Sequence, residues 1–256
     1  MSACRQKIPV KTPDELARMR DACRIVADTT QAVLRLARPG VTTGALDACA
    51  ARVISAAGAT PTFKGYRGFP GCICVSINEE LIHGIPGPRV IRTGDIVSVD
   101  IGVTYRGMIG DMARTVCIGA VPGDVAALVA GAREALAAAC RILRAGIQVG
   151  DLSHALQCFA DTHGYGIVRD YVGHGVGAAL HEPPQIPNFG ARGSGMVIPA
   201  GATLAIEPMF TLGDYRVRVL SDKWTVVTHD GSPCAHYENT VLVTEGGCEV
   251  LTVDPA

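Results

Sequence analysis

A repeated segment is the feature that most restricts the fold of this chain. Residues 38–46 are matched about 106 residues later by residues 144–152, and each copy follows one long helical pattern and opens another. Such self-similarity indicates two related halves, although two similar loops could also arise by chance. Because no linker separates the halves, we predict a single domain with pseudo-twofold symmetry over residues 11–256, preceded by a short N-terminal extension, residues 1–10.

Helix signals flank both copies of the repeat. Thr12 and Glu15 fit a capping box at the start of a helix that continues to about Leu36. A second helix is expected from about residue 43 to 58 and a further long helix over about residues 124–143.

Strand signals follow each pair of helices. Residues 96–105 and 108–118 are rich in β-formers and are separated by Arg106-Gly107, which is typical of a hairpin turn. Later strands are expected at residues 203–206, 224–228 and 240–244. Helices combined with antiparallel strands in this order indicate an α+β fold.

Composition excludes several classes of protein. The formal net charge of −1 over 256 residues gives no electrostatic basis for binding nucleic acid or an acidic membrane. A hydrophobic content of 48% is sufficient for a sizeable core. No apolar run reaches the roughly 18 residues of a membrane span, and the N-terminus lacks an apolar signal core. We therefore expect a cytoplasmic protein whose ten cysteines, with no Cys-x-x-Cys pair among them, are free thiols.

Two aspartates interrupt the apolar hairpin. Asp100 lies within the first strand and Asp111 within the returning one, opposite each other or nearly so depending on the turn register. Two carboxylates about 5 Å apart in an apolar strand pair repel each other and lose hydration. A bound cation would remove that conflict, whereas the alternative is that one residue is solvated and the other caps a turn.

Further carboxylates and a histidine occupy similar positions. Glu207 ends an apolar run and precedes a proline, and Glu238 stands just before an expected strand. With the repeat offset subtracted, Glu207 falls within one residue of Asp100. His174 is flanked by glycines that allow close backbone approach. Four carboxylates and one imidazole form an oxygen-rich ligand set that favours a dinuclear metal hydrolase.

The motifs around these residues resemble those of the type I methionine aminopeptidases, which have the pita-bread fold. They lie at residues 76–79, 83–86, 94–97, 173–177, 181–184, 206–209 and 237–240. The resemblance implies helices covering a curved antiparallel sheet. It also implies a metal-dependent hydrolase that removes the initiator methionine from nascent polypeptides when the second residue is small. Only 33 positions separate His174 from Glu207, too few for the insertion of type II enzymes, so the chain is similar to a short bacterial form.

The same resemblance implies roles for particular residues. Two divalent ions, which could be Co, Mn, Fe, Ni or Zn, would be bound by Asp100, Asp111, His174, Glu207 and Glu238, with Asp111 and Glu238 bridging them. The ions would make a bridging water acidic, and this water would be the nucleophile. Glu207 would also act as general base and acid, His181 would stabilise the oxyanion, and His83 would contact the scissile amide or leaving amine. The methionine side chain would be held by Phe63, Tyr66, Phe69, Cys74, Leu180 and Trp224.

Alternatives of other classes remain open. An Xaa-Pro peptidase of the same fold usually carries an extra N-terminal domain, and a non-catalytic binding protein of this fold usually lacks the ligands. We also expect a monomer that contacts the ribosome only transiently and binds neither nucleic acid nor membrane.

Overall fold

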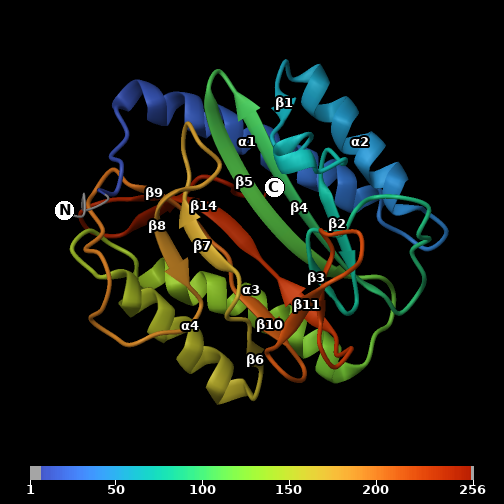
Figure 1. The fold of residues 1–256 in the computed structure, drawn as a ribbon. Helices are drawn as coiled ribbons and strands as arrows, with labels where there is room; N and C mark the ends of the chain where they lie inside the picture. The colour runs from blue at the N-terminus through green and yellow to red at the C-terminus, as the bar shows by residue number, and fades with distance from the viewer. Residues whose placement is uncertain (1–6, 255–256) are drawn as a thin grey trace.

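One large antiparallel sheet runs through the molecule, and the computed structural model describes it within residues 7–254 (Figure 1). Residues 1–6 of the expected N-terminal extension lie outside the described residues. The strands of this sheet follow the order β1 (Thr60–Pro61), β4 (Ile96–Tyr105), β5 (Met108–Cys117), β14 (Glu238–Val243), β9 (Thr203–Ile206), β7 (Val172–Gly175) and β8 (Glu182–Pro187), with β2 (Cys74–Ile77) on β4 and β15 (Cys248–Val250) on β14.

Two small antiparallel sheets complete the strand structure. One joins β13 (Cys234–His236), β10 (Met209–Thr211) and β6 (Gly166–Ile167), and the other joins β11 (Val217–Val219), β12 (Val226–Thr228) and β3 (Glu80–Ile82). The expected strand at residues 224–228 therefore begins two residues later than predicted. The α+β prediction is confirmed.

The helices lie in two pairs on opposite sides of the view in Figure 1. They are α1 (Pro13–Leu36), α2 (Thr43–Ala56), α3 (Gly123–Ile142) and α4 (Val149–His163), and a single 3-10 turn, η1 (Tyr66–Gly68), lies between β1 and β2. The predicted capping box at Thr12 is confirmed: its hydroxyl accepts from the Glu15 amide, and the Glu15 carboxylate accepts from the Thr12 amide. No helix within the described residues is long and apolar enough to cross a membrane.

The two halves predicted from the repeat have separate hydrophobic cores. Residues of α1 and α2 pack against β2 and β4, and residues of α3 and α4 pack against β9 and β14. The repeated loops also make equivalent backbone bridges, from Thr42 to Val90 in one half and from Gln148 to Val197 in the other. The self-similarity therefore reflects a structural repeat and not a chance likeness of two loops.

Strand register places the carboxylates on one face of the sheet. In the hairpin, Asp100 pairs with Ala113 and Asp111 pairs with Gly102, so the two aspartates are diagonal neighbours with side chains on the same side. Glu238 was predicted to stand just before a strand, but it is the first residue of β14, because pairing with Ala113 extends that strand backwards. Glu207 lies in the break between β9 and β10, where Pro208 prevents continued pairing.

Candidate metal centre and substrate pocket

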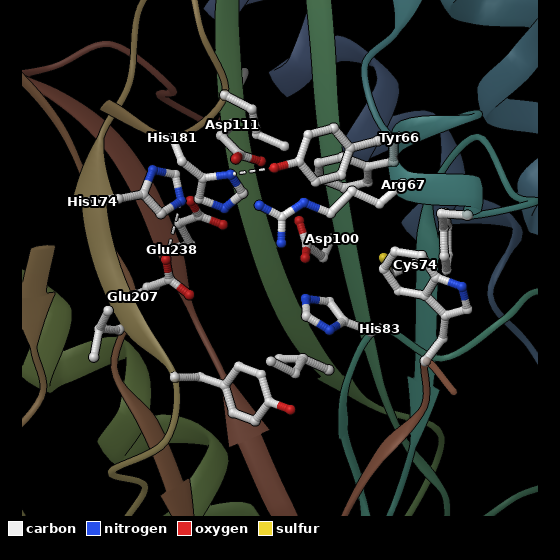
Figure 2. A pocket seen from close by; sticks show the side chains of 17 residues that line it. Tyr66, Arg67, Cys74, His83, Asp100, Asp111, His174, His181, Glu207 and Glu238 are labelled. Atoms are coloured by element: carbon white, nitrogen blue, oxygen red, sulfur yellow. Dashed lines mark hydrogen bonds and ion pairs between the residues drawn. The ribbon is translucent and has the colours of Figure 1, made fainter. Parts of the chain in front are cut away.

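A cavity of about 280 Å³ opens where the two halves meet over the central strands. Figure 2 shows that the labelled acidic and imidazole side chains point into it. Its lining includes every candidate site residue predicted from the sequence: Phe63, Tyr66, Phe69, Cys74, His83, Asp100, Asp111, His174, Leu180, His181, Glu207, Trp224 and Glu238.

The floor of the cavity has carboxylate oxygens without partners. Asp100 Oδ1, Asp111 Oδ1 and Glu238 Oε1 are buried and accept no hydrogen bond from the described residues. Ligand atoms of Asp111, His174 and Glu238 lie within 4.8 Å of one another. Glu207 joins this group through His174, whose Nε2 is 3.4 Å from Glu207 Oε1. Buried acceptors of this kind are costly unless a donor or cation satisfies them, so the residues fit a divalent metal centre.

The pKa values of the carboxyl groups at the floor of the cavity also show that burying these charges together is unfavourable. Burial raises the pKa of Asp100 to about 7. Burial raises the pKa of Asp111 well above its ordinary value, and the charges of Asp100 and Glu207 add to the shift. The pKa values of Glu207 and Glu238 are also raised well above normal, chiefly by burial. In the absence of a cation the centre therefore holds protons, which a bound metal would displace.

His174 is oriented by the backbone. Its Nδ1 lies 3.0 Å from the carbonyl oxygen of Gly175, which makes Nδ1 the protonated nitrogen and leaves the lone pair of Nε2 facing the carboxylates. Burial, with a smaller contribution from the nearby His181, lowers the pKa of His174 to about 4. A neutral imidazole with a free Nε2 lone pair is the form that binds metal.

Two more histidines face the cavity without joining the carboxylate group. His181 Nδ1 lies 3.0 Å from the hydroxyl of Tyr66, and its ring centroid is 4.3 Å from that of His174. His83 packs edge-on against Trp224, with ring centroids 6.2 Å apart. Burial lowers the pKa of both histidines, to about 4 for His83, so both rings are neutral near pH 7.

An apolar wall stands beside this polar floor. The rings of Phe69 and Trp224 meet edge to face at 5.1 Å, and Phe63 and Leu180 are buried in the same cluster. Cys74 pairs in register with Asp100, which places the wall directly beside the carboxylates. Burial raises the pKa of the Cys74 thiol well above its ordinary value, so in the metal-free protein this sulfur is an uncharged lining atom.

Comparison with known proteins decides the family. The model of metallopeptidase family M24 matches residues 17–245. The chain belongs to metallopeptidase family M24. Among curated M24-like relatives, methionine aminopeptidase 1 of Bacillus subtilis is 47% identical over 94% of this chain and 98% of its own length. Methionine aminopeptidase of Escherichia coli is 37% identical over 96% of this chain and 94% of its own length.

Solved structures agree with this assignment. The methionine aminopeptidase of Thermotoga maritima superposes with a TM-score of 0.95 at 45% identity, covering 96% of this chain and 99% of that chain. A prolidase from Pyrococcus furiosus shares the fold with a TM-score of 0.79 at 23% identity, and this chain covers 66% of it. The expected pita-bread fold is therefore confirmed, and this M24 chain is more similar to the methionine aminopeptidases than to the prolidase.

Several residues of the site were not found from the sequence. Arg67, Ile82, Tyr171 and Val172 also line the cavity. His236 is buried just before Glu238, with Nε2 at 3.6 Å from Glu207 Oε2. The separation of two residues between His236 and Glu238 at the start of a strand is the one sequence signal that could have indicated His236.

Proposed function

We propose that this M24 chain removes methionine from the N-terminus of peptides and proteins whose second residue is small. The observation that carries the proposal is the juxtaposition of a buried, unpartnered carboxylate cluster with an apolar pocket in one cavity. The cluster suits divalent ions, and the pocket suits a flexible thioether chain. Relatives named methionine aminopeptidase at 37–47% identity support the same activity.

The metal would be held by Asp100, Asp111, His174, Glu207 and Glu238. Ions bound there would supply Lewis acidity and a water acidified to serve as nucleophile. Several carboxylates that face one another support a pair of ions, and the oxygen-rich set is compatible with Mn, Fe, Co, Ni or Zn. Glu207, whose carboxylate faces the cavity beside His174, would receive the proton of the water and return it to the leaving amine.

The histidines would act on the substrate. If the Tyr66 hydroxyl donates to Nδ1 of His181, the remaining proton of that ring is on Nε2, which faces the cavity as a donor. This proton is placed to stabilise the oxyanion formed at the scissile carbonyl. His83, held at a left-handed φ of 59° and packed against Trp224, would contact the scissile amide or the leaving amine.

We also infer the setting of this activity. The domain over residues 11–256 would act as a cytoplasmic monomer on nascent chains, in transient contact with the ribosome. The formal net charge of −1 supports a protein that binds neither nucleic acid nor membrane by itself.

The test is kcat/KM for methionine release across Met-Xaa peptides, because discrimination between substrates resides in that ratio. We expect cleavage when the second residue is Gly, Ala or Ser, and poor cleavage when it is Leu, Lys or Phe. We expect no cleavage of a peptide that has proline second and a residue other than methionine first. Equal cleavage of Met-Gly and Met-Phe peptides would favour a broader aminopeptidase. Preferential cleavage of Xaa-Pro would favour the Xaa-Pro peptidase alternative.

A further inference from the structure

Arg67 is a charged residue that the proposed chemistry does not use. It lies in the middle of the 3-10 turn η1 with φ 47° and ψ 26°, a left-handed conformation that is uncommon for a residue with a side chain. Gly65 and Gly68 on either side also have positive φ, at 82° and 89°. Such strained positions gather at ligand-binding sites, and this one fixes the direction in which the guanidinium leaves the backbone.

That direction is toward the mouth of the cavity. Figure 2 shows the Arg67 side chain extending from its loop over the cavity toward His181. Its guanidinium carbon is 5.4 Å from the centre of the Tyr66 ring, whose hydroxyl contacts His181. Within residues 7–254, the Arg67 guanidinium forms no hydrogen bond or ion pair. Its cation-π contact with the Tyr66 ring therefore leaves its N–H donors free.

A second, outer hollow continues outward from the cavity. It has a volume of about 560 Å³, and five lining residues belong to both spaces: Tyr66, Arg67, Val172, His174 and His181. Arg67 and Glu182 are its charged lining residues. Glu182 is already paired with Lys11, whose Nζ lies 2.7 Å from it. The hollow therefore carries one unbalanced positive charge, on Arg67.

In the proposed function, the course of the substrate would connect the two spaces. A methionine side chain in the apolar pocket and a scissile carbonyl beside His181 would place the small second residue inside the cavity. An extended chain advances about 3.3–3.6 Å per residue, so the third and fourth residues are the first to enter the outer hollow. A side chain at either position then passes the guanidinium of Arg67.

Resting on the proposed function, we propose that Arg67 gives the enzyme a preference for substrates with an aspartate or glutamate at the third or fourth position. The recognised chemistry is a carboxylate, which the planar guanidinium can bind through two parallel hydrogen bonds. Because Arg67 is exposed, the preference is modest and sensitive to salt.

The experiment compares peptides that differ only in the charge of one side chain. Met-Gly-Xaa-Gly and Met-Gly-Gly-Xaa peptides, with Glu, Gln or Lys as Xaa and with amidated C-termini, remove the terminal carboxylate as a second source of negative charge. In at least one series, we expect wild-type kcat/KM to be about two- to fivefold higher for the Glu peptide than for the Gln peptide, as for an exposed ion pair. The value for the Lys peptide should be lower than that for the Gln peptide. The difference should lie in KM, as uniform binding requires, and should shrink in high salt.

The variant that tests the assignment is Arg67→Asn, since asparagine tolerates the left-handed backbone at this position. In this variant, the ratio of kcat/KM for the Glu peptide to kcat/KM for the Lys peptide should fall toward one. The matched control is Lys64→Gln. Lys64 is an exposed cation near Arg67 in the chain, but it lines neither the cavity nor the outer hollow, so this variant should keep the wild-type ratio. Equal wild-type rates for all three charges, or loss of the preference in Lys64→Gln but not in Arg67→Asn, would overturn this inference alone. Failure to cleave even the Gln peptides would overturn the proposed function and this inference together.

Discussion

Lys11 and Glu182, 171 positions apart in the chain, form a partly buried ion pair with Nζ 2.7 Å from Oε2. Their side chains are only 5% and 12% exposed. Glu182 directly follows His181, and its Oε1 accepts from the amide of Ala179. The pair therefore ties the segment before α1 to the loop that carries the proposed oxyanion donor.

Lys11→Met should destabilise the protein, because it leaves a largely buried carboxylate without its cation. We expect a loss of about 2 kcal/mol in the free energy of unfolding, between the values for exposed and for fully buried pairs, measured by urea denaturation. The matched control is the exposed pair of Arg20 and Glu249, with side chains 45% and 44% exposed. Arg20→Gln should lose less than about 1 kcal/mol. Equal losses in the two variants would show that the pair of Lys11 and Glu182 stabilises the fold no more than an exposed pair does.

His181→Ala should lower kcat by roughly 10²-fold, as removal of an oxyanion donor does. Metal content should stay at the wild-type level, because His181 is hydrogen-bonded to Tyr66 and lies outside the group formed by Asp111, His174 and Glu238. Metal analysis beside steady-state kinetics makes the check. Loss of metal from a folded variant would mean that His181 is itself a ligand.

Gly102→Ala should reduce the volume of the proposed methionine pocket. A Cβ at Gly102 would lie 2.6 Å from Cε1 of Phe63, a ring that lines the cavity and would have to move. Overpacking of about 1 kcal/mol or more predicts a KM raised roughly fivefold for a Met-Gly peptide. Gly246→Ala, where a Cβ meets nothing within 4 Å, serves as the control. An unchanged KM in Gly102→Ala would show that Phe63 does not contact the methionine side chain of the substrate.

Asp100 should make the metal-free protein less stable as pH rises. Its pKa is about 7 in the folded protein against 3.8 for an ordinary aspartate, so the folded state holds the proton more tightly. The resulting penalty is absent below pH 3.8, grows between these two pKa values and is complete above about pH 7. Metal-free Asp100→Asn should therefore match wild type in acid and exceed it by a few kcal/mol above neutrality, at about 1.4 kcal/mol per pKa unit. Denaturation of both proteins across this pH range measures the difference, and a constant difference would contradict the account.

Local signals predicted much of the fold. The capping box at Thr12 needs only residues within one turn, and the structure has it as predicted. The hairpin of β4 and β5 was also predictable, since Arg106-Gly107 and the apolar strands on either side are adjacent in sequence. The repeat of 106 residues predicted two halves because a duplicated loop preserves its backbone pairing, as at Thr42 and Gln148.

Features set by long-range packing could not be predicted in this way. The start of β14 at Glu238 depends on pairing with Ala113, more than a hundred positions away. The contact between Gly102 and Phe63 depends on how β1 lies on β4. Arg67 carried no periodic signal, because it is one exposed charge in a turn whose direction is set by backbone dihedrals.

For the candidate site, the residues alone indicated a dinuclear hydrolase but no substrate. The unusual positions of Asp100 and Asp111 in apolar strands were sufficient to predict a cation, since burying paired carboxylates is otherwise costly. The methionine pocket and the roles of His83 and His181 came from resemblance to the aminopeptidases. Apolar lining residues such as Phe69 do not differ from ordinary core residues until the cavity is seen.

The central claim is that the carboxylate cluster holds the metal that makes this chain an aminopeptidase. It is tested most directly by methionine release from a Met-Gly peptide before and after exhaustive chelation, with metal loss confirmed by elemental analysis, followed by addition of Mn²⁺ or Co²⁺. We predict that activity disappears with the metal and returns with either ion in wild type, whereas Asp111→Asn stays inactive. Full activity in protein shown to be free of metal would contradict the account.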